Sequence, residues 1–283
     1  MLRALVFSLL ILLTLGFQPS KPSVPWQEAL KYRQNELFPV TIGKYGFPLV
    51  SVAVNGKNLN LVWDTGNMAG LLINPDVAKR LGLGVAGESK YYDTSGALLG
   101  THEIYGISEL NLFGKTWANL QADEFWQNDL DGTIGPRFVL KRRFTLDYQN
   151  KVIAVSDSLL PTQNSIGDML PLISSSRYPG MIVIEGKVNG RTVLIQVDTG
   201  KSRTCVDPAL ATALGLPQAK NGYQIRDLEI GHYSFSVPSA KEVNFKGISQ
   251  ELPQPILLGI GSDILSQVVM SVDYSQQILA ISR

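Results

Sequence analysis

Apolar and β-branched residues occur in short runs separated by Gly, Pro, Asn and Ser along most of the chain. Two of these runs, Leu49 to Val54 and Met181 to Val188, each end at an Asn-Gly pair. A run of this kind that ends at Asn-Gly is typical of a strand that turns back in a tight hairpin. The runs Leu59–Trp63 and Val193–Val197 then supply the returning strands. The pattern therefore predicts β-hairpins in both halves of the chain.

Further strands are predicted at the end of each half, and helix is predicted in few places. Phe144–Asp147 and Val269–Asp273 lead into polar turns that are followed by closing apolar strands. Helical spacing is convincing in Asp76–Leu81 and Pro208–Leu214, each short and each beginning at or after a proline. We therefore expect an all-β protein.

The two halves repeat each other. Four motifs recur in the same order in both, namely Asn-Gly, Asp-Thr-Gly, an apolar residue followed by Gly, and Asp-Tyr. They begin at Asn55, Asp64, Ile134 and Asp147 in the first half, and at Asn189, Asp198, Ile260 and Asp273 in the second. The spacing from turn glycine to aspartate (56 to 64, 190 to 198) is the same in both halves. A repeat of this length predicts two copies of one fold, each of about 120 residues.

The repeat divides the chain into predicted units. Residues 37–158 form a first lobe, 159–178 a link rich in Pro, Ser and Gly, and 179–283 a second lobe. Residues 18–36 are expected to be a linker. Residues 1–17 combine a positive start with an apolar run that is shorter than the about 20 residues of a membrane span. This is typical of a secretory signal peptide, with an uncleaved N-terminal anchor as the alternative, so we expect an exported protein, periplasmic or secreted.

Composition narrows the classes of function. The net charge is +1 and charged residues make up 17% of the chain, so no strong field favours nucleic acid. Cys205 is the only cysteine, which excludes an internal disulfide. The two histidines, His102 and His232, are far apart and have no metal-ligand spacing, which argues against a zinc site and a Ser-His mechanism. We expect no metal, no cofactor and no nucleic-acid partner.

The two Asp-Thr-Gly triplets are the candidate chemistry. One such triplet could simply be a turn that ends a strand, with Asp accepting backbone hydrogen bonds and Gly supplying an unusual φ. Two triplets at equivalent positions of a repeat suggest that Asp64 and Asp198 meet across a pseudo-twofold axis. Paired carboxyls cannot both ionise cheaply, so one keeps a proton and the pair can supply both an acid and a base.

The other triplet residues have supporting roles in this hypothesis. Gly66 and Gly200 would let the backbone approach closely and donate amides to the carboxylates. Thr65 and Thr199 would lock the two loops together.

With these motifs, the chain from about Leu37 to Ile281 resembles the pepsin/retropepsin superfamily of aspartic proteases, with tandem retropepsin-like domains in one chain. The resemblance implies a bilobal fold made of two β-barrel lobes with a cleft between them. It also implies an aspartic endopeptidase in which Asp64 and Asp198 share a catalytic water, acting as a monomer on a peptide or protein substrate. Two alternatives stay open. One is a catalytically weak peptide-binding module that keeps the cleft, and the other is an active unit formed by pairing with another chain.

The first half also contains an insertion, from about Glu88 to Ile107, where the second half has only Pro217 to Gln224. Two strand-like arms surround the turn Thr94-Ser95-Gly96, which by resemblance is the flap that closes over substrate. Tyr91 or Tyr92 would then contact the substrate, and the sequence does not choose between them. An exposed surface hairpin is the alternative interpretation.

Asn67 and Lys201 depart from the superfamily pattern, which usually has a small or hydroxyl-bearing residue after the triplet. Asn67 could still donate a hydrogen bond. Lys201 would either favour the charged form of Asp198 and shift the pH dependence of activity, or point its ammonium into water.

Overall fold

The structure is a computed structural model that describes residues 25–127, 129–161 and 167–283. The expected signal peptide or anchor at residues 1–17 lies outside the described residues. Within the described part, no helix has the length and apolar character needed to cross a membrane.

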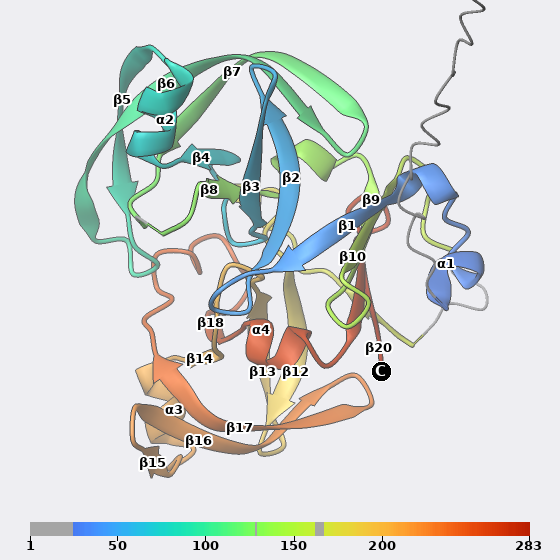
Figure 1. Cartoon of the computed structure of the whole chain (residues 1–283). Coiled ribbons are helices and arrows are strands. Elements are labelled where there is room, and N and C mark those ends of the chain that lie inside the picture. The colour runs from blue at the N-terminus through green and yellow to red at the C-terminus, as the bar shows by residue number, and fades with distance from the viewer. Residues whose placement is uncertain (1–24, 128, 162–166) are drawn as a thin grey trace, which may run out of the picture.

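The first lobe, drawn mostly in blue and green in Figure 1, is a strongly bent β-sheet. Its strands run in the order β1-β2-β3-β8-β4-β7-β6-β5, and an added pairing of β2 with β6 folds the sheet back on itself. The elements of this lobe are β1 (Leu37–Ile42), β2 (Pro48–Val54), β3 (Lys57–Trp63), β4 (Leu71–Ile73), α2 (Pro75–Leu81), β5 (Val85–Tyr92), β6 (Leu98–Leu112), β7 (Lys115–Glu124), β8 (Gly132–Ile134) and the 3₁₀ turn η2 (Pro136–Val139).

The second lobe, in yellow to red, repeats this arrangement. Its order, β12-β13-β18-β14-β17-β16-β15 with β12 also pairing to β16, matches β2-β3-β8-β4-β7-β6-β5 position by position. Its elements are β12 (Val183–Val188), β13 (Arg191–Val197), β14 (Cys205–Val206), α3 (Pro208–Ala213), β15 (Gln218–Ala219), β16 (Gly222–Ile230), β17 (Tyr233–Glu242), β18 (Ile256–Ile260) and α4 (Ser262–Leu265).

An antiparallel sheet joins the lobes, in the order β11-β20-β19-β9-β10-β1. Its remaining members are β9 (Arg143–Asp147), β10 (Val152–Ser156), β11 (Asp168–Pro171), β19 (Val269–Asp273) and β20 (Ile278–Ser282). The closing strands β9 and β19 pair with each other, with Thr145 opposite Ser271 and their hydroxyls 2.7 Å apart. The fold is all-β and two-lobed, as expected. The segment expected to be only a link supplies β11.

Local sequence explains why equivalent elements form in both lobes. Asn55-Gly56 and Asn189-Gly190 all have positive φ, between 46° and 77°, which is the geometry of a type I′ hairpin turn. The helices α2 and α3 are capped at their N-termini by Asn74 and Asp207, whose side chains each accept an amide hydrogen bond at 2.9 Å. These caps satisfy amides that a short helix otherwise leaves unpaired.

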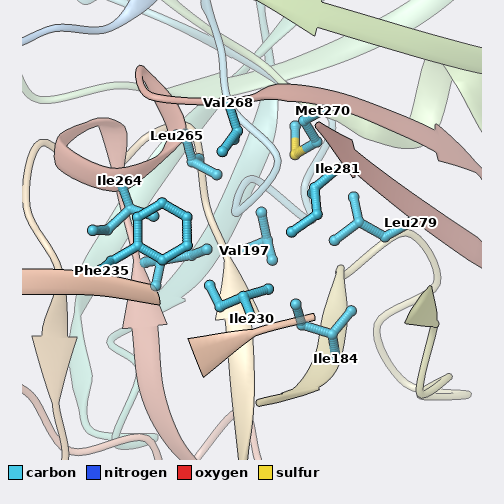
Figure 2. A pocket seen from close by; sticks show the side chains of 11 residues that line it. Ile184, Val197, Ile230, Phe235, Ile264, Leu265, Val268, Met270, Leu279 and Ile281 are labelled. Atoms are coloured by element: carbon cyan, nitrogen blue, oxygen red, sulfur yellow. The ribbon is translucent and has the colours of Figure 1, made fainter. Parts of the chain in front are cut away.

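Each lobe is filled by the inward faces of its strands. Figure 2 shows this interior in the second lobe, where Ile184, Val197 and Phe235 point toward residues of α4 and the shared sheet. The space they surround has a wholly apolar lining, so it is packing of the core and offers no polar group for chemistry.

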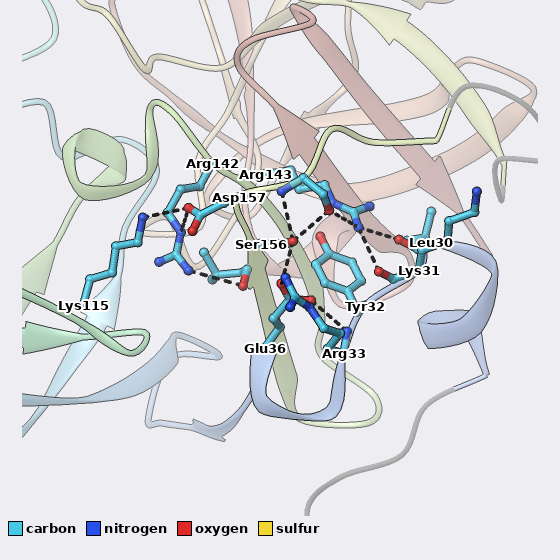
Figure 3. A network of polar contacts seen from close by, with 12 residues as sticks. Leu30, Lys31, Tyr32, Arg33, Glu36, Lys115, Arg142, Arg143, Ser156 and Asp157 are labelled. Carbon is cyan, nitrogen blue, oxygen red and sulfur yellow. Dashed lines mark hydrogen bonds and ion pairs between the residues drawn. The ribbon is translucent and has the colours of Figure 1, made fainter.

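Residues 25–36, expected to be a linker, pack firmly on the shared sheet. They form α1 (Trp26–Ala29) and the 3₁₀ turn η1 (Gln34–Glu36), and the indole of Trp26 is buried and donates to Asp147 at 2.7 Å. Figure 3 shows the neighbouring polar network, in which buried Arg143 donates to the carbonyl of Leu30 at 2.6 Å and lies over the ring of Tyr32. Aromatic burial and charge-assisted hydrogen bonds anchor this segment.

Candidate functional site

The two aspartates lie at equivalent places, each directly after the second strand of the Asn-Gly hairpin of its lobe. Asp64 follows β3 and Asp198 follows β13. In each lobe the strand of the apolar-Gly motif runs parallel beside it, so that the amides of Asp64 and Asp198 donate to the carbonyls of Ile134 and Ile260, both at 3.0 Å. This pairing fixes both aspartates at the base of their loops.

The two loops face each other at close range. A Cβ placed on Gly66 would lie 2.3 Å from Oδ2 of Asp198, and a Cβ on Gly200 would lie 2.3 Å from Oδ1 of Asp64. Only glycine fits at either position, because no real side chain tolerates such a separation. Each glycine amide also donates to the aspartate of its own loop, at 2.8 Å for Gly66 and 2.9 Å for Gly200. The structure therefore places each carboxyl against the glycine of the opposite loop, and the charge of Asp198 acts on Asp64.

The two threonines cross-link the loops, in the arrangement expected from the sequence. The amide of Thr65 donates to Oγ1 of Thr199 at 2.9 Å, and the amide of Thr199 donates to Oγ1 of Thr65 at 3.0 Å. Each hydroxyl then donates to a carbonyl of the opposite lobe, Val197 at 2.9 Å and Trp63 at 2.5 Å. Both threonines are fully buried, so these bonds hold the lobes in register without competition from water.

The electrostatics of the pair are strongly shifted. Burial and the neighbouring charge of Asp198 together raise the pKa of Asp64 to about 8, although the amide of Gly66 and the ammonium of Lys201 oppose this. Near neutral pH the arrangement therefore holds one proton on Asp64.

Lys201 points toward Asp198 and not into water. Its ammonium contacts Oδ2 of Asp198 and donates to the side chain of Gln196 at 3.0 Å, and only 17% of the lysine side chain is exposed. Burial lowers the pKa of Lys201, but the carboxylates of Asp198 and Asp64 outweigh burial and raise it. The lysine is therefore a cation that faces the pair.

Asn67 occupies the matching position of the first lobe and behaves differently. Its amide group donates to Oγ1 of Thr133 at 2.7 Å and its oxygen accepts the amide of Gly70 at 3.1 Å. These bonds brace the loop that carries Asp64. The two loops are thus alike in backbone and different in charge.

The hairpin expected from the insertion is formed by β5 and β6, joined by a turn in which Asp93 accepts from Ser95 and Ala97. The structure separates the two tyrosines that the sequence left equivalent. Tyr91 stacks on His102 at 4.7 Å and meets Trp126 edge-on at 4.9 Å, and burial together with the charges of Asp64 and Asp93 raises its pKa. Tyr92 is 51% exposed. Tyr91, 37% exposed, is therefore the more enclosed of the two tyrosines and the one on which the charge of Asp64 acts.

The tip of this hairpin reaches the second lobe. Oγ1 of Thr94 donates to the carbonyl of Asn244 at 2.9 Å, and the carbonyl of Thr94 accepts the amides of Gly247 at 2.9 Å and Ile248 at 3.2 Å. A Cβ on Gly247 would lie 2.4 Å from the amide nitrogen of Gly96, so the two backbones are in direct contact. We call these contacts, from Thr94 and Gly96 to residues 244–248, the tip contacts. No simple sequence pattern marks them.

The two histidines have unrelated positions. His102 is buried beside Tyr91, and its Nε2 has no hydrogen-bond partner among the described residues. His232 is exposed and pairs with Asp168. No cluster of residues able to hold a metal ion is found in the described part of the chain.

Comparison with known proteins points to one family. Residues 184–259 match the family model described as aspartyl protease, a segment that contains Asp198-Thr199-Gly200. No curated protein matches the chain significantly. The match confirms the resemblance to the pepsin/retropepsin superfamily through the second lobe. That the first lobe is a tandem copy of the same domain stays a prediction, supported by the sequence repeat and the equal strand order.

Proposed function

We propose that this protein, whose second lobe matches the aspartyl protease family, is an aspartic endopeptidase that uses Asp64 and Asp198 as one catalytic pair. The single observation that supports this best is the close approach of the two carboxyls across paired Asp-Thr-Gly loops. We further propose that the protein is exported and works as a monomer on peptide or protein substrates without metal or cofactor.

The geometry suits hydrolysis of an amide by water. One carboxylate takes a proton from a water molecule as the water oxygen bonds to the peptide carbonyl carbon, while the protonated partner gives its proton to the carbonyl oxygen. The tetrahedral intermediate then collapses as the carbon–nitrogen bond breaks. The nitrogen takes up the proton gained by the first carboxylate, and the second carboxyl regains its own from a hydroxyl of the intermediate. The pair ends in its starting state.

The surrounding residues are assigned supporting roles in the proposal. Gly66, Gly200, Thr65 and Thr199 hold the pair in place. The hairpin with Tyr91 and the turn Thr94-Ser95-Gly96 acts as the flap over an extended substrate, with Tyr91 and not Tyr92 facing it.

Cleavage of a mixed peptide library between pH 3 and 8 tests this function. Wild type is expected to cut internal peptide bonds, and Asp64→Asn and Asp198→Asn are each expected to abolish turnover because the two groups act as a unit. Thr101→Ala, an exposed change in the flap hairpin, is the control. Near-normal activity in either Asn variant would refute the shared pair. Binding of peptides without cleavage at any pH would favour the alternative, a peptide-binding module.

A further inference from the structure

Lys201 makes the electrostatic surroundings of the two aspartates different, although their loops are otherwise symmetrical. The two loops share their backbone bonds, glycines and threonine links, but Asn67 in the first carries no charge and Lys201 in the second does. The ammonium contacts Asp198 directly, and 8% of the Asp198 side chain is exposed. A charge this close to one carboxylate and shielded from water stabilises negative charge there much more than on its neighbour.

The lysine is held in this position by the fold. Gln196, on β13, accepts one of its hydrogen bonds at 3.0 Å. Gly259, on β18, lies beside the lysine stem, since a Cβ there would be 3.5 Å from its Cε. A Cβ on Gly261 would lie 2.5 Å from the carbonyl oxygen of Lys201, so the backbones of these two residues are in close contact as well. The ammonium is therefore held by protein groups and is not a free surface charge.

Three further ionisable groups near the pair carry no positive charge. Tyr91 of the flap, Tyr148 after β9 and Cys205 of β14 all have raised pKa values, with burial as the main cause, and so stay neutral. Asp263 of α4 is engaged by the amide and hydroxyl of Thr204. Lys201 is the cation that lowers the pKa of Asp64 among the described residues.

Resting on the proposed function, we infer that Lys201 is a positioning residue that assigns Asp198 as the carboxylate base and Asp64 as the proton-bearing acid. In this scheme Asp198 takes the proton of the attacking water and Asp64 protonates the carbonyl oxygen. The ammonium also keeps the singly charged pair intact at acid pH, and so it extends activity toward lower pH.

The test is the pH profile of kcat/KM for Lys201→Met, with Lys220→Met, the same change at an exposed lysine of the second lobe, as the matched control. Without the cation the single negative charge is less stable, so the acid limb of the profile is expected to move up by about 1–3 pH units. The alkaline limb of the profile, which Asp64 sets, is expected to shift to higher pH by less than the acid limb, because the ammonium does not contact Asp64. Lys201→Arg is expected to restore the wild-type limb, and Lys220→Met to stay within about half a pH unit of it.

Thermal unfolding from pH 3 to 7 gives a second test that needs no turnover. Wild type is expected to lose stability relative to Lys201→Met as the pH falls, because the buried ammonium is left without a negative partner once the pair of carboxyls takes up its second proton. If Lys201→Met does not fold, Lys201→Gln takes its place. Superimposable acid limbs together with a stability difference that is constant in pH would overturn the inference. Absence of cleavage in wild type would instead refute the proposed endopeptidase, while the unfolding series still decides the role of Lys201.

Discussion

Replacing the two aspartates by asparagine, one at a time, should change the stability of the protein in opposite directions. Asp64→Asn and Asp198→Asn remove the same chemical group from equivalent loops and keep nearly the same shape. Because Lys201 contacts Asp198 and not Asp64, the free energy of unfolding at pH 7 is expected to rise in the first variant and fall in the second.

The gain in Asp64→Asn follows from the raised pKa of Asp64, from 3.8 to about 8. A carboxyl whose pKa is higher in the folded state destabilises the fold above its unfolded-state pKa, and this penalty grows between about pH 4 and pH 8. At pH 7 the full penalty would be about 4 kcal/mol. Asp64 keeps partial contact with solvent, so we discount it to about 1–3 kcal/mol. Asparagine removes this penalty.

The loss in Asp198→Asn follows from the lysine that is left behind. Removing one partner of a buried ion pair costs about 3–5 kcal/mol. Lys201 can escape part of this cost by losing its proton, which from its ordinary pKa of 10.5 requires about 5 kcal/mol at pH 7, or by moving toward water. Its side chain is 17% exposed, so we expect a net loss of about 2–4 kcal/mol.

Denaturant unfolding followed by circular dichroism at pH 7 and pH 4 measures both effects. At pH 7 the variants should differ by at least about 3 kcal/mol, which corresponds to about 6 °C or more in Tm for a protein of this size. At pH 4 the gain from Asp64→Asn should nearly vanish, because this pH is close to the unfolded-state pKa of 3.8, above which the penalty accumulates. Equal shifts in the two variants at pH 7 would refute the charge asymmetry of the pair.

Three further changes test other parts of the structure. Thr199→Val leaves the buried amide of Thr65 without its acceptor, so the free energy of unfolding should fall by about 1–3 kcal/mol, measured by denaturant unfolding. Trp26→Phe removes the bond to buried Asp147 and should lower stability by a similar amount, measured as Tm. Gly247→Ala places a methyl group against the flap tip, so cleavage of that turn in limited proteolysis should accelerate several-fold.

Matched variants separate these effects from general damage. Thr199→Ser keeps the hydroxyl and should retain most of the stability that Thr199→Val loses. Gly100→Ala adds a methyl group to the same hairpin where nothing lies within 4 Å, so proteolysis at the tip should stay at the wild-type rate. Equal rates for Gly100→Ala and Gly247→Ala would show that the tip contacts do not hold the β5–β6 hairpin. An unchanged Tm in Trp26→Phe would contradict anchoring of residues 25–36.

The repeat made much of this fold predictable from the sequence. The Asn-Gly turns fix hairpins locally, since both residues tolerate positive φ, and the equal spacing to each Asp-Thr-Gly fixes where the strands end. The predicted strands and helices agree with β2, β3, β9, α2 and their counterparts to within a few residues. The pairing of Asp64 with Asp198 follows from the same symmetry.

Other features depend on contacts between distant residues and had no local signal. The direction of Lys201 is set by Gln196 and by the closeness of β18, which the sequence does not place beside it. The polar, proline-rich stretches around residues 18–36 and 159–178 were expected to be links. In the structure, β11 pairs at the edge of the shared sheet, and Trp26 hydrogen-bonds to Asp147 of its strand β9. Burial of His102 likewise follows from Tyr91 and Trp126 closing around it.

If the hairpin acts as the proposed flap, its tip contacts restrict what can reach the aspartates. The hairpin is fixed at its base by β7 and at its end by residues 244–248, so it crosses from one lobe to the other as a closed bridge. A free chain terminus could be threaded beneath such a bridge without disturbing it, whereas an internal loop of a folded protein could enter only after the bridge had parted. For a peptidase built this way, the rate of substrate binding would depend on whether the substrate protein is folded.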